Sequence, residues 1–131
     1  EAEDFTGLFE LARQADVDVA VVRPIAGGAL AGNILEQGAA GIHQLSKGYF
    51  RMLDDLRGTL ICTAQKYAFL HRPPEQSITD AAYRYILAHP QVATVIGGYS
   101  DAGQLSEAVA ATAKGRLSDE DLAAIDRLHL G

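Results

Sequence analysis

Residues 90–107 read PQVATVIGGYSDAGQLSE, in which a β-branched apolar run leads into two glycines and then into a helix start. Residues 92–96 have the composition of a strand, and Gly97 and Gly98 follow them directly. A glycine turn at a helix N-terminus builds an anion site, because the backbone can approach the ligand and the helix dipole points at it. The pattern indicates an α/β domain and leaves two local interpretations, a phosphate-binding turn or a plain strand-to-helix turn.

The composition limits the chain to one modest domain and argues against some classes of partner. It has 131 residues, of which 48% are hydrophobic and 21% are charged. Seventeen acidic and eleven basic residues give a net charge of −6, and no Lys/Arg cluster is present to follow a nucleic-acid backbone. No apolar run is long enough to cross a bilayer. We therefore expect neither a nucleic-acid partner nor a membrane association.

The single cysteine favours a reducing environment. Cys62 lies in the apolar segment LICTA, where a buried thiol is expected rather than a reactive one, and one cysteine allows no internal disulfide. The N-terminus has no signal-peptide pattern. A cytoplasmic location fits these features.

Helical and extended patterns alternate along the chain. The predicted order is a helix that ends at residues 14–16, an extended run over 17–22, a glycine-rich loop with a short helical turn over 25–41, helices over 49–56, 59–70 and 77–87, a strand over 92–96, a helix over 101–111, and a last helix capped by Ser118. Leu122, Ile125 and Leu128 are spaced as a buried stripe of the last helix. Helical crossovers return the chain to the same end of a sheet, so we expect the two strands to pair in parallel. Apolar parallel strands need cover on both faces and neighbours on both edges, which two strands cannot supply.

Three segments carry a family resemblance. The strings RPIAGGALAG, SITDAAYRYILAHP and VATVIGGYSDAGQLSEAVAATAKGRLSDEDLAAIDRL follow in order and at suitable spacing, and together they resemble the C-terminal part of an aldo-keto reductase. The resemblance implies a (β/α)8 TIM barrel that binds NADP or NAD at the C-terminal face of its strands and reduces small carbonyl substrates by hydride transfer. It also implies that residues 1–131 are a single incomplete domain, the C-terminal portion of the barrel with its last two strands and their helices.

The resemblance transfers no catalytic residue to this chain. The family's proton donor is a tyrosine assisted by a lysine, an aspartate and usually a histidine, all on early strands of the barrel. None of the tyrosines stands at a matching position; they are Tyr49, Tyr67, Tyr83, Tyr85 and Tyr99. The histidines show no metal-ligand spacing and are expected to be surface or helix-end residues; they are His43, His71, His89 and His129.

Cofactor contacts are implied for two groups of residues. The first group follows the first strand and consists of Arg23, Pro24, Ile25, Gly27 and Gly28. Here the arginine is placed near the pyrophosphate, and the two glycines match a loop that folds over the cofactor. The second group follows the second strand, matches positions that hold the adenosine and its 2′-phosphate, and consists of Gly97, Gly98, Ser100, Gln104 and Glu107. Each assignment has an alternative. Arg23 could be an ordinary strand-end arginine, and Gly27 and Gly28 could give only loop flexibility. Gln104 and Glu107 could lie on a solvated helix face.

Two positions depart from the family pattern and leave the choice between NADP and NAD open. Ser100 stands where an arginine often meets the 2′-phosphate, and Ala108 stands where an asparagine often contacts adenine. Loss of an arginine–phosphate pair removes a contact of about 1.5–3 kcal/mol before desolvation is counted. Asp101 adds repulsion if it faces that site.

Three hypotheses follow. The first is the cofactor-binding part of an NAD(P)-dependent oxidoreductase, inactive as 131 residues alone. The second is a non-catalytic nucleotide-binding or protein-interaction module, and the third is a structural oligomer. Self-association through open sheet edges belongs to the last two, and in every case we expect the strand residues of 17–22 and 92–96 to be exposed or covered by another chain.

Overall fold

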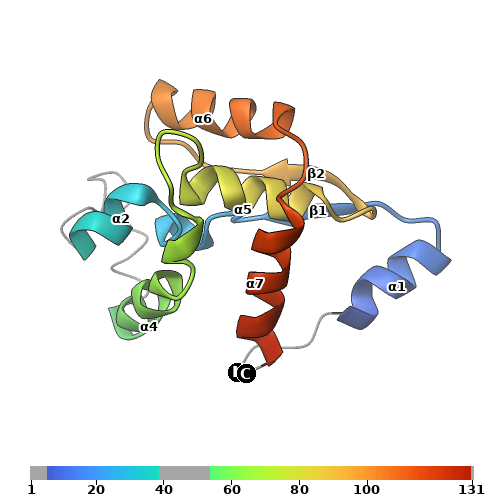
Figure 1. Cartoon of the computed structure of the whole chain (residues 1–131). Coiled ribbons are helices and arrows are strands. Elements are labelled where there is room, and N and C mark those ends of the chain that lie inside the picture. The colour runs from blue at the N-terminus through green and yellow to red at the C-terminus, as the bar shows by residue number, and fades with distance from the viewer. Residues whose placement is uncertain (1–5, 39–53, 131) are drawn as a thin grey trace.

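The computed structural model describes residues 6–38 and 54–130, which form helices and a two-stranded sheet (Figure 1). The elements are α1 Thr6–Gln14, β1 Val19–Val22, the 3₁₀ turn η1 Ala26–Gly28, α2 Gly32–Gln37, α4 Asp54–Gln65, the 3₁₀ turn η4 Ala68–Leu70, α5 Ile78–Leu87, β2 Val92–Ile96, α6 Ala102–Ala113 and α7 Asp119–Leu130. Most of the helix predicted over 49–56 lies outside the described residues. Within them, no helix has the length and apolar character needed to cross a membrane.

Two helices begin at the N-cap residues that the sequence predicts. The Ser77 hydroxyl accepts the Asp80 N–H at 3.0 Å and begins α5, and the Ser118 hydroxyl accepts the Asp121 N–H at 3.1 Å before α7. The helix predicted over 59–70 is wrong as one element. α4 ends at Gln65, and a separate 3₁₀ turn covers Ala68–Leu70.

The two strands pair in parallel, as the helical crossovers predict. The register joins Val22 to Ile96, and an irregularity between Val19 and Ala20 interrupts it near the start of β1. β1 begins two residues later than predicted, because the Val17 N–H still bonds to the Ala12 carbonyl at 2.9 Å as the end of α1 closes. Parallel pairing fixes which loops emerge together, since both strands end at the same edge of the sheet.

Only one face of the sheet is covered by helices. Val95 packs against a buried cluster of Tyr83 from α5 with Ala108 and Ala111 from α6. The opposite face has no cover among the described residues. The side chains of Val22 and Ile96 are 62% and 58% exposed. This exposure confirms the expectation that two strands cannot bury themselves.

A second core lies where α5 meets α7. Leu70, Ala81, Leu117 and Ile125 are buried together, and Leu122 packs at their edge. The buried stripe predicted for the last helix is therefore wrong at its end. Leu128 is 40% exposed, because α7 runs away from α5 (Figure 1) and its last turn passes beyond the core.

Cys62 is exposed, so the prediction of a buried thiol is also wrong. The buried face of α4 carries Ala64, and Ile61 packs against Ile34 of α2. In a helix, residues 61 and 64 share a face, whereas residue 62 is turned away from it.

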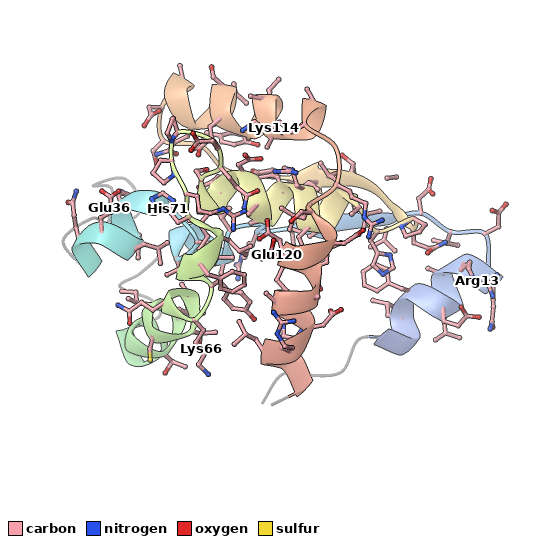
Figure 2. All side chains as sticks on the ribbon, in the orientation of Figure 1. Arg13, Glu36, Lys66, His71, Lys114 and Glu120 are labelled. Atoms are coloured by element: carbon pink, nitrogen blue, oxygen red, sulfur yellow. The ribbon has the colours of Figure 1, made fainter. Side chains whose placement is uncertain are left out.

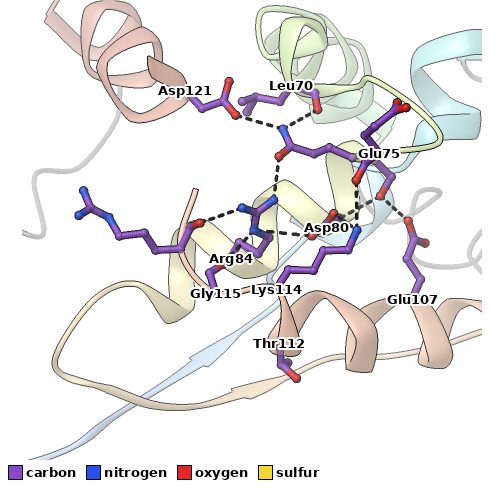
Figure 3. A network of polar contacts seen from close by, with 12 residues as sticks. Leu70, Glu75, Asp80, Arg84, Glu107, Thr112, Lys114, Gly115 and Asp121 are labelled. Carbon is purple, nitrogen blue, oxygen red and sulfur yellow. Dashed lines mark hydrogen bonds and ion pairs between the residues drawn. The ribbon is translucent and has the colours of Figure 1, made fainter. Parts of the chain in front are cut away.

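A polar network holds α5 between the turn before it and the α6–α7 loop (Figure 3). Arg84 donates to the carbonyls of Gly115 and Arg116 at 2.9 and 2.8 Å, and to the Gln76 side chain at 2.8 Å. Lys114 donates to the buried carboxylate of Asp80 at 2.6 Å. These contacts fix α5 and the C-terminal end of α6 against each other.

Candidate functional site

The pairing of Val22 with Ile96 brings the two predicted cofactor groups to one edge of the sheet. Arg23 follows the first of these residues and Gly97 follows the second. Neighbouring strands lie about 4.8 Å apart, so the two loops start side by side at the carboxyl ends of the strands. In α/β sheets this edge is where ligands bind.

The loop after β1 is tightly wound. Arg23, Ala26, Gly27 and Gly28 all have positive φ, at 57°, 49°, 67° and 103°. Ala26 N–H bonds to the Arg23 carbonyl at 3.0 Å and Gly28 N–H to the Ile25 carbonyl at 2.9 Å. Two non-glycine residues in the left-handed region mark stored backbone strain, which clusters at functional sites.

The predicted cofactor residues after β1 face in two directions. Pro24 is buried and Ile25 packs against the cluster around Tyr83, so both support the loop from the protein side. Arg23 is exposed. The solvent-facing part of this group is therefore the arginine and the glycine turn that follows it.

The two glycines after β2 have different surroundings. A Cβ on Gly97 would lie 2.5 Å from the Tyr83 hydroxyl and 2.6 Å from the Tyr99 hydroxyl, so no side chain fits there. Gly98 has nothing within 4 Å of the same position and lies exposed. Gly97 is needed for packing, whereas Gly98 leaves its backbone open to a ligand.

The N-terminus of α6 already holds a carboxylate. Asp101 accepts the Gln104 N–H at 2.9 Å, and the Gln104 side-chain oxygen accepts the Ser100 N–H at 2.9 Å. This reciprocal pair is close to a capping box and uses donors that an anion would otherwise take. Gln104 is thus neither a plain solvated residue nor a fully available ligand group.

Glu107 faces α5 rather than open solvent. Its carboxylate accepts a short hydrogen bond from the Ser77 hydroxyl at the start of that helix (Figure 3). Ala108, next along α6, is only 3% exposed in the cluster around Tyr83. In this chain position 108 faces the protein interior, so its side chain is not exposed to a ligand at the surface of α6.

His71 is a residue whose role sequence reasoning missed. Its side chain is 15% exposed, its Nδ1 accepts the Ile78 N–H at 3.2 Å, and its Nε2 lies 3.5 Å from a Glu36 carboxylate oxygen (Figure 2). A Cβ on Gly32 would come within 2.8 Å of the ring. The histidine therefore joins α2 to α5, and no local pattern predicts this link because Glu36 lies 35 residues away.

His89 keeps the predicted place at a helix end. Its N–H bonds to the Ile86 carbonyl at 3.1 Å, and its ring stacks on Phe9 of α1 at a centroid distance of 3.9 Å. In the part of the chain that the structure describes, no three His, Cys, Asp or Glu side chains come together as a metal site.

Comparison with known proteins gives the family. The aldo/keto reductase family profile matches residues 2–129. The chain is also 30% identical over 116 residues to the Bacillus subtilis (strain 168) protein called uncharacterized oxidoreductase YqkF, an alignment that covers 88% of this chain and 35% of that protein. The chain thus spans about a third of this relative's length. With the match over nearly its whole length, the chain belongs to the aldo/keto reductase family.

Proposed function

We propose that this chain is the C-terminal, cofactor-binding part of an NAD(P)-dependent aldo-keto reductase that reduces small carbonyl compounds by hydride transfer. Residues 1–131 would form one incomplete domain, in which β1 and β2 are the last two strands of a (β/α)8 barrel. The family match and the name of the Bacillus subtilis relative support an oxidoreductase. The proposal rests above all on the register, which sets Arg23 beside Gly97 at the carboxyl edge of the sheet.

The uncovered face of the sheet supports the proposal that the two strands belong to a barrel. Side chains of parallel strands need cover on both faces. Val22 and Ile96 are paired in the register, are mostly exposed, and lie on the face away from α5 and α6. In a closed barrel this face would be the packed interior, filled by side chains of the other strands.

The residues at the sheet edge fit a dinucleotide. Arg23 is an exposed cation that can pair with a pyrophosphate, and the turn of Gly27 and Gly28 allows close approach of the backbone. Gly98 offers open backbone on the neighbouring loop. The bound nicotinamide cofactor would supply the hydride, while these residues would bind and orient it.

The 2′-phosphate fits less well. Asp101 puts a negative charge at the start of α6 and already accepts a first-turn N–H, and Ser100 gives no positive charge. A ribose hydroxyl can donate to such a carboxylate, whereas a phosphate is repelled by it. We infer a site that discriminates in favour of NADP less strongly than one with the family's arginine in place of Ser100.

The proton donor is proposed to lie outside this chain. Among the described tyrosines, Tyr83 is 4% exposed and its hydroxyl is held by Tyr99 at 3.1 Å. Burial raises the pKa of Tyr83. A hydroxyl held in this way is poorly placed to reach a substrate carbonyl, which general acid catalysis requires.

The proposal is tested by titrating the full-length protein with NADH and following the fluorescence of the bound nicotinamide. R23Q is expected to weaken binding about tenfold or more, because a charge-assisted phosphate contact is lost. R13Q is the matched control, since Arg13 lies on α1 and pairs with Glu10 at 2.7 Å (Figure 2). Absence of NADH and NADPH binding would overturn the proposal, and binding without carbonyl reduction would favour a nucleotide-binding module.

A further inference from the structure

A partly open cavity of about 220 Å³ lies on the helical side of the molecule and is bordered by Pro24 and Leu30 of the chain after β1. It is bounded by α5, α7, η4 and the chain after β1. Its wall is almost wholly apolar and includes Ala81 and Ala82 of α5, Leu30, and Ile125 of α7. Among the described residues, no Asp, Glu, Lys or Arg side chain lines it.

The two alanines explain why space remains there. Ala81 is fully buried in the core with Leu70 and Ile125, and Ala82 is its neighbour on the wall. Their methyl groups reach only a short way from α5, and Tyr85 and Ile86 one turn later continue the same wall. Among the described residues, the cavity follows from the packing of α5 near α7, η4 and the chain after β1.

The size and the apolar wall define the class of occupant. A cavity of roughly 150 Å³ lined by aliphatic and aromatic side chains stays dry and binds benzene. The present cavity has room for a six-membered ring with a short substituent. A charged molecule is disfavoured, because its desolvation would go uncompensated against such a wall.

One polar pair of side chains lies in the otherwise apolar wall. The Tyr67 hydroxyl and the His129 Nε2 are joined by a hydrogen bond of 3.0 Å, and both residues line the cavity. A tyrosine hydroxyl in one hydrogen bond still has capacity for another. The pair can therefore meet one hydroxyl group of a ligand while the ring lies against the apolar wall.

We propose that this cavity binds a small, uncharged aromatic compound with a single hydroxyl group, such as a short alkylphenol. The ring occupies the space above Ala81 and Ala82, and the hydroxyl bonds at the Tyr67–His129 pair. No contact with a dinucleotide is part of this proposal, although Pro24 borders both the cavity and the proposed cofactor loop.

The experiment titrates the full-length protein with 4-ethylphenol and with ethylbenzene, using calorimetry and the methyl NMR signals of Ala82 and Ile125. Saturable binding is expected, with 4-ethylphenol the tighter ligand. A82L places an isobutyl group in the cavity and should weaken both ligands at least about tenfold. A110L is the control, because Ala110 is exposed on α6 and lies outside the cavity wall.

A second variant tests the polar end separately. Y67F removes the hydroxyl and should weaken 4-ethylphenol several-fold while leaving ethylbenzene nearly unchanged. Equal binding of 4-ethylphenol to A82L, A110L and the parent protein would overturn the proposal. So would the absence of saturable binding in a parent protein whose NMR spectrum shows it to be folded, since the cavity would then be filled or closed in solution.

Discussion

The hydroxyl groups of Tyr83 and Tyr99 lie 3.1 Å apart and close over Gly97. Tyr83 comes from the middle of α5, and Tyr99 comes from the loop after β2. Burial raises the pKa of Tyr83, with its hydrogen bond to Tyr99 as a further cause, so the Tyr83 hydroxyl keeps its proton at neutral pH. Helix α5 thus fixes the turn that ends β2 by an interaction between distant segments.

This contact predicts unequal effects of alanine at the two adjacent glycines. G97A forces a methyl group to within 2.5 Å of the Tyr83 hydroxyl and should destabilise the protein by about 1–3 kcal/mol. G98A meets nothing within 4 Å and should change stability by less than about 0.5 kcal/mol. Urea unfolding of the two variants measures the difference.

The two tyrosines provide a control for the mechanism. Because the Tyr99 hydroxyl and its ring carbon Cζ are 2.6 and 2.9 Å from the added methyl group, the Tyr83 hydroxyl and the Tyr99 ring must both be removed to make room. In the Y83F/Y99A background, the cost of G97A should fall to about half or less of its value in the parent. An unchanged cost would show that the backbone, and not the tyrosine pair, excludes alanine.

A second prediction concerns the ion pair between Arg72 and Asp121. Two hydrogen bonds of 2.9 and 2.7 Å join the guanidinium to the carboxylate, which is 4% exposed. R72M should cost about 1–3 kcal/mol, because it leaves a buried charge with fewer partners. The arginine side chain is half exposed, so solvent keeps the loss below that of a fully buried pair.

The pH dependence of this loss has a defined sign. The hydrogen bond from Arg72 lowers the pKa of Asp121 below that of an unfolded aspartate, about 3.9. The pair therefore stabilises the fold fully above that pH, and the contribution is lost as the pH falls through the lower folded value. The difference in stability between R72M and the parent should narrow below about pH 4. R13M, at an exposed pair with Glu10, should show no measurable change at any pH.

Local sequence patterns predicted the helices and strands of this chain better than they predicted the contacts between them. The cap at Ser77, the strand Val92–Ile96 and the parallel pairing all follow from nearby residues or from connection length. The burial of Cys62 was predicted wrongly. A rotation of a helix by one residue decides whether a side chain is buried, and sequence spacing over a short apolar run does not fix that rotation.

The site shows the same limit. The order of strand, glycines and helix placed both loops at one edge of the sheet, as the register confirms. Three features of the site depend on partners 30 or more residues away or on the packing of another element. They are the burial of Pro24, the hydrogen bond between Glu107 and Ser77, and the contact between His71 and Glu36. Residue type and spacing carry no information on such partners.

A third prediction is that the 131-residue chain alone shows no NAD(P)H-dependent reduction of simple aldehydes. The proposed function places the proton donor outside this chain, and the face with Val22 and Ile96 is uncovered among the described residues. Cofactor oxidation by the purified chain should equal a protein-free blank. Steady turnover above that blank, retained after a further purification step, would contradict this assignment of the catalytic group.

The last prediction concerns the choice of cofactor. With Ser100 and Asp101 at the start of α6, the full-length protein should favour NADPH over NADH by less than roughly a hundredfold, about 2.7 kcal/mol. S100R restores a cation beside the 2′-phosphate and should raise NADPH affinity about tenfold or more with little effect on NADH. S106R adds the same charge at an exposed position on α6 and is the matched control. Fluorescence titration of the parent and both variants with each reduced cofactor gives the six affinities. If the parent already prefers NADPH by more than a hundredfold, a residue outside this chain binds the 2′-phosphate. If S106R matches S100R, the gain reflects net charge and not the site at the α6 N-terminus.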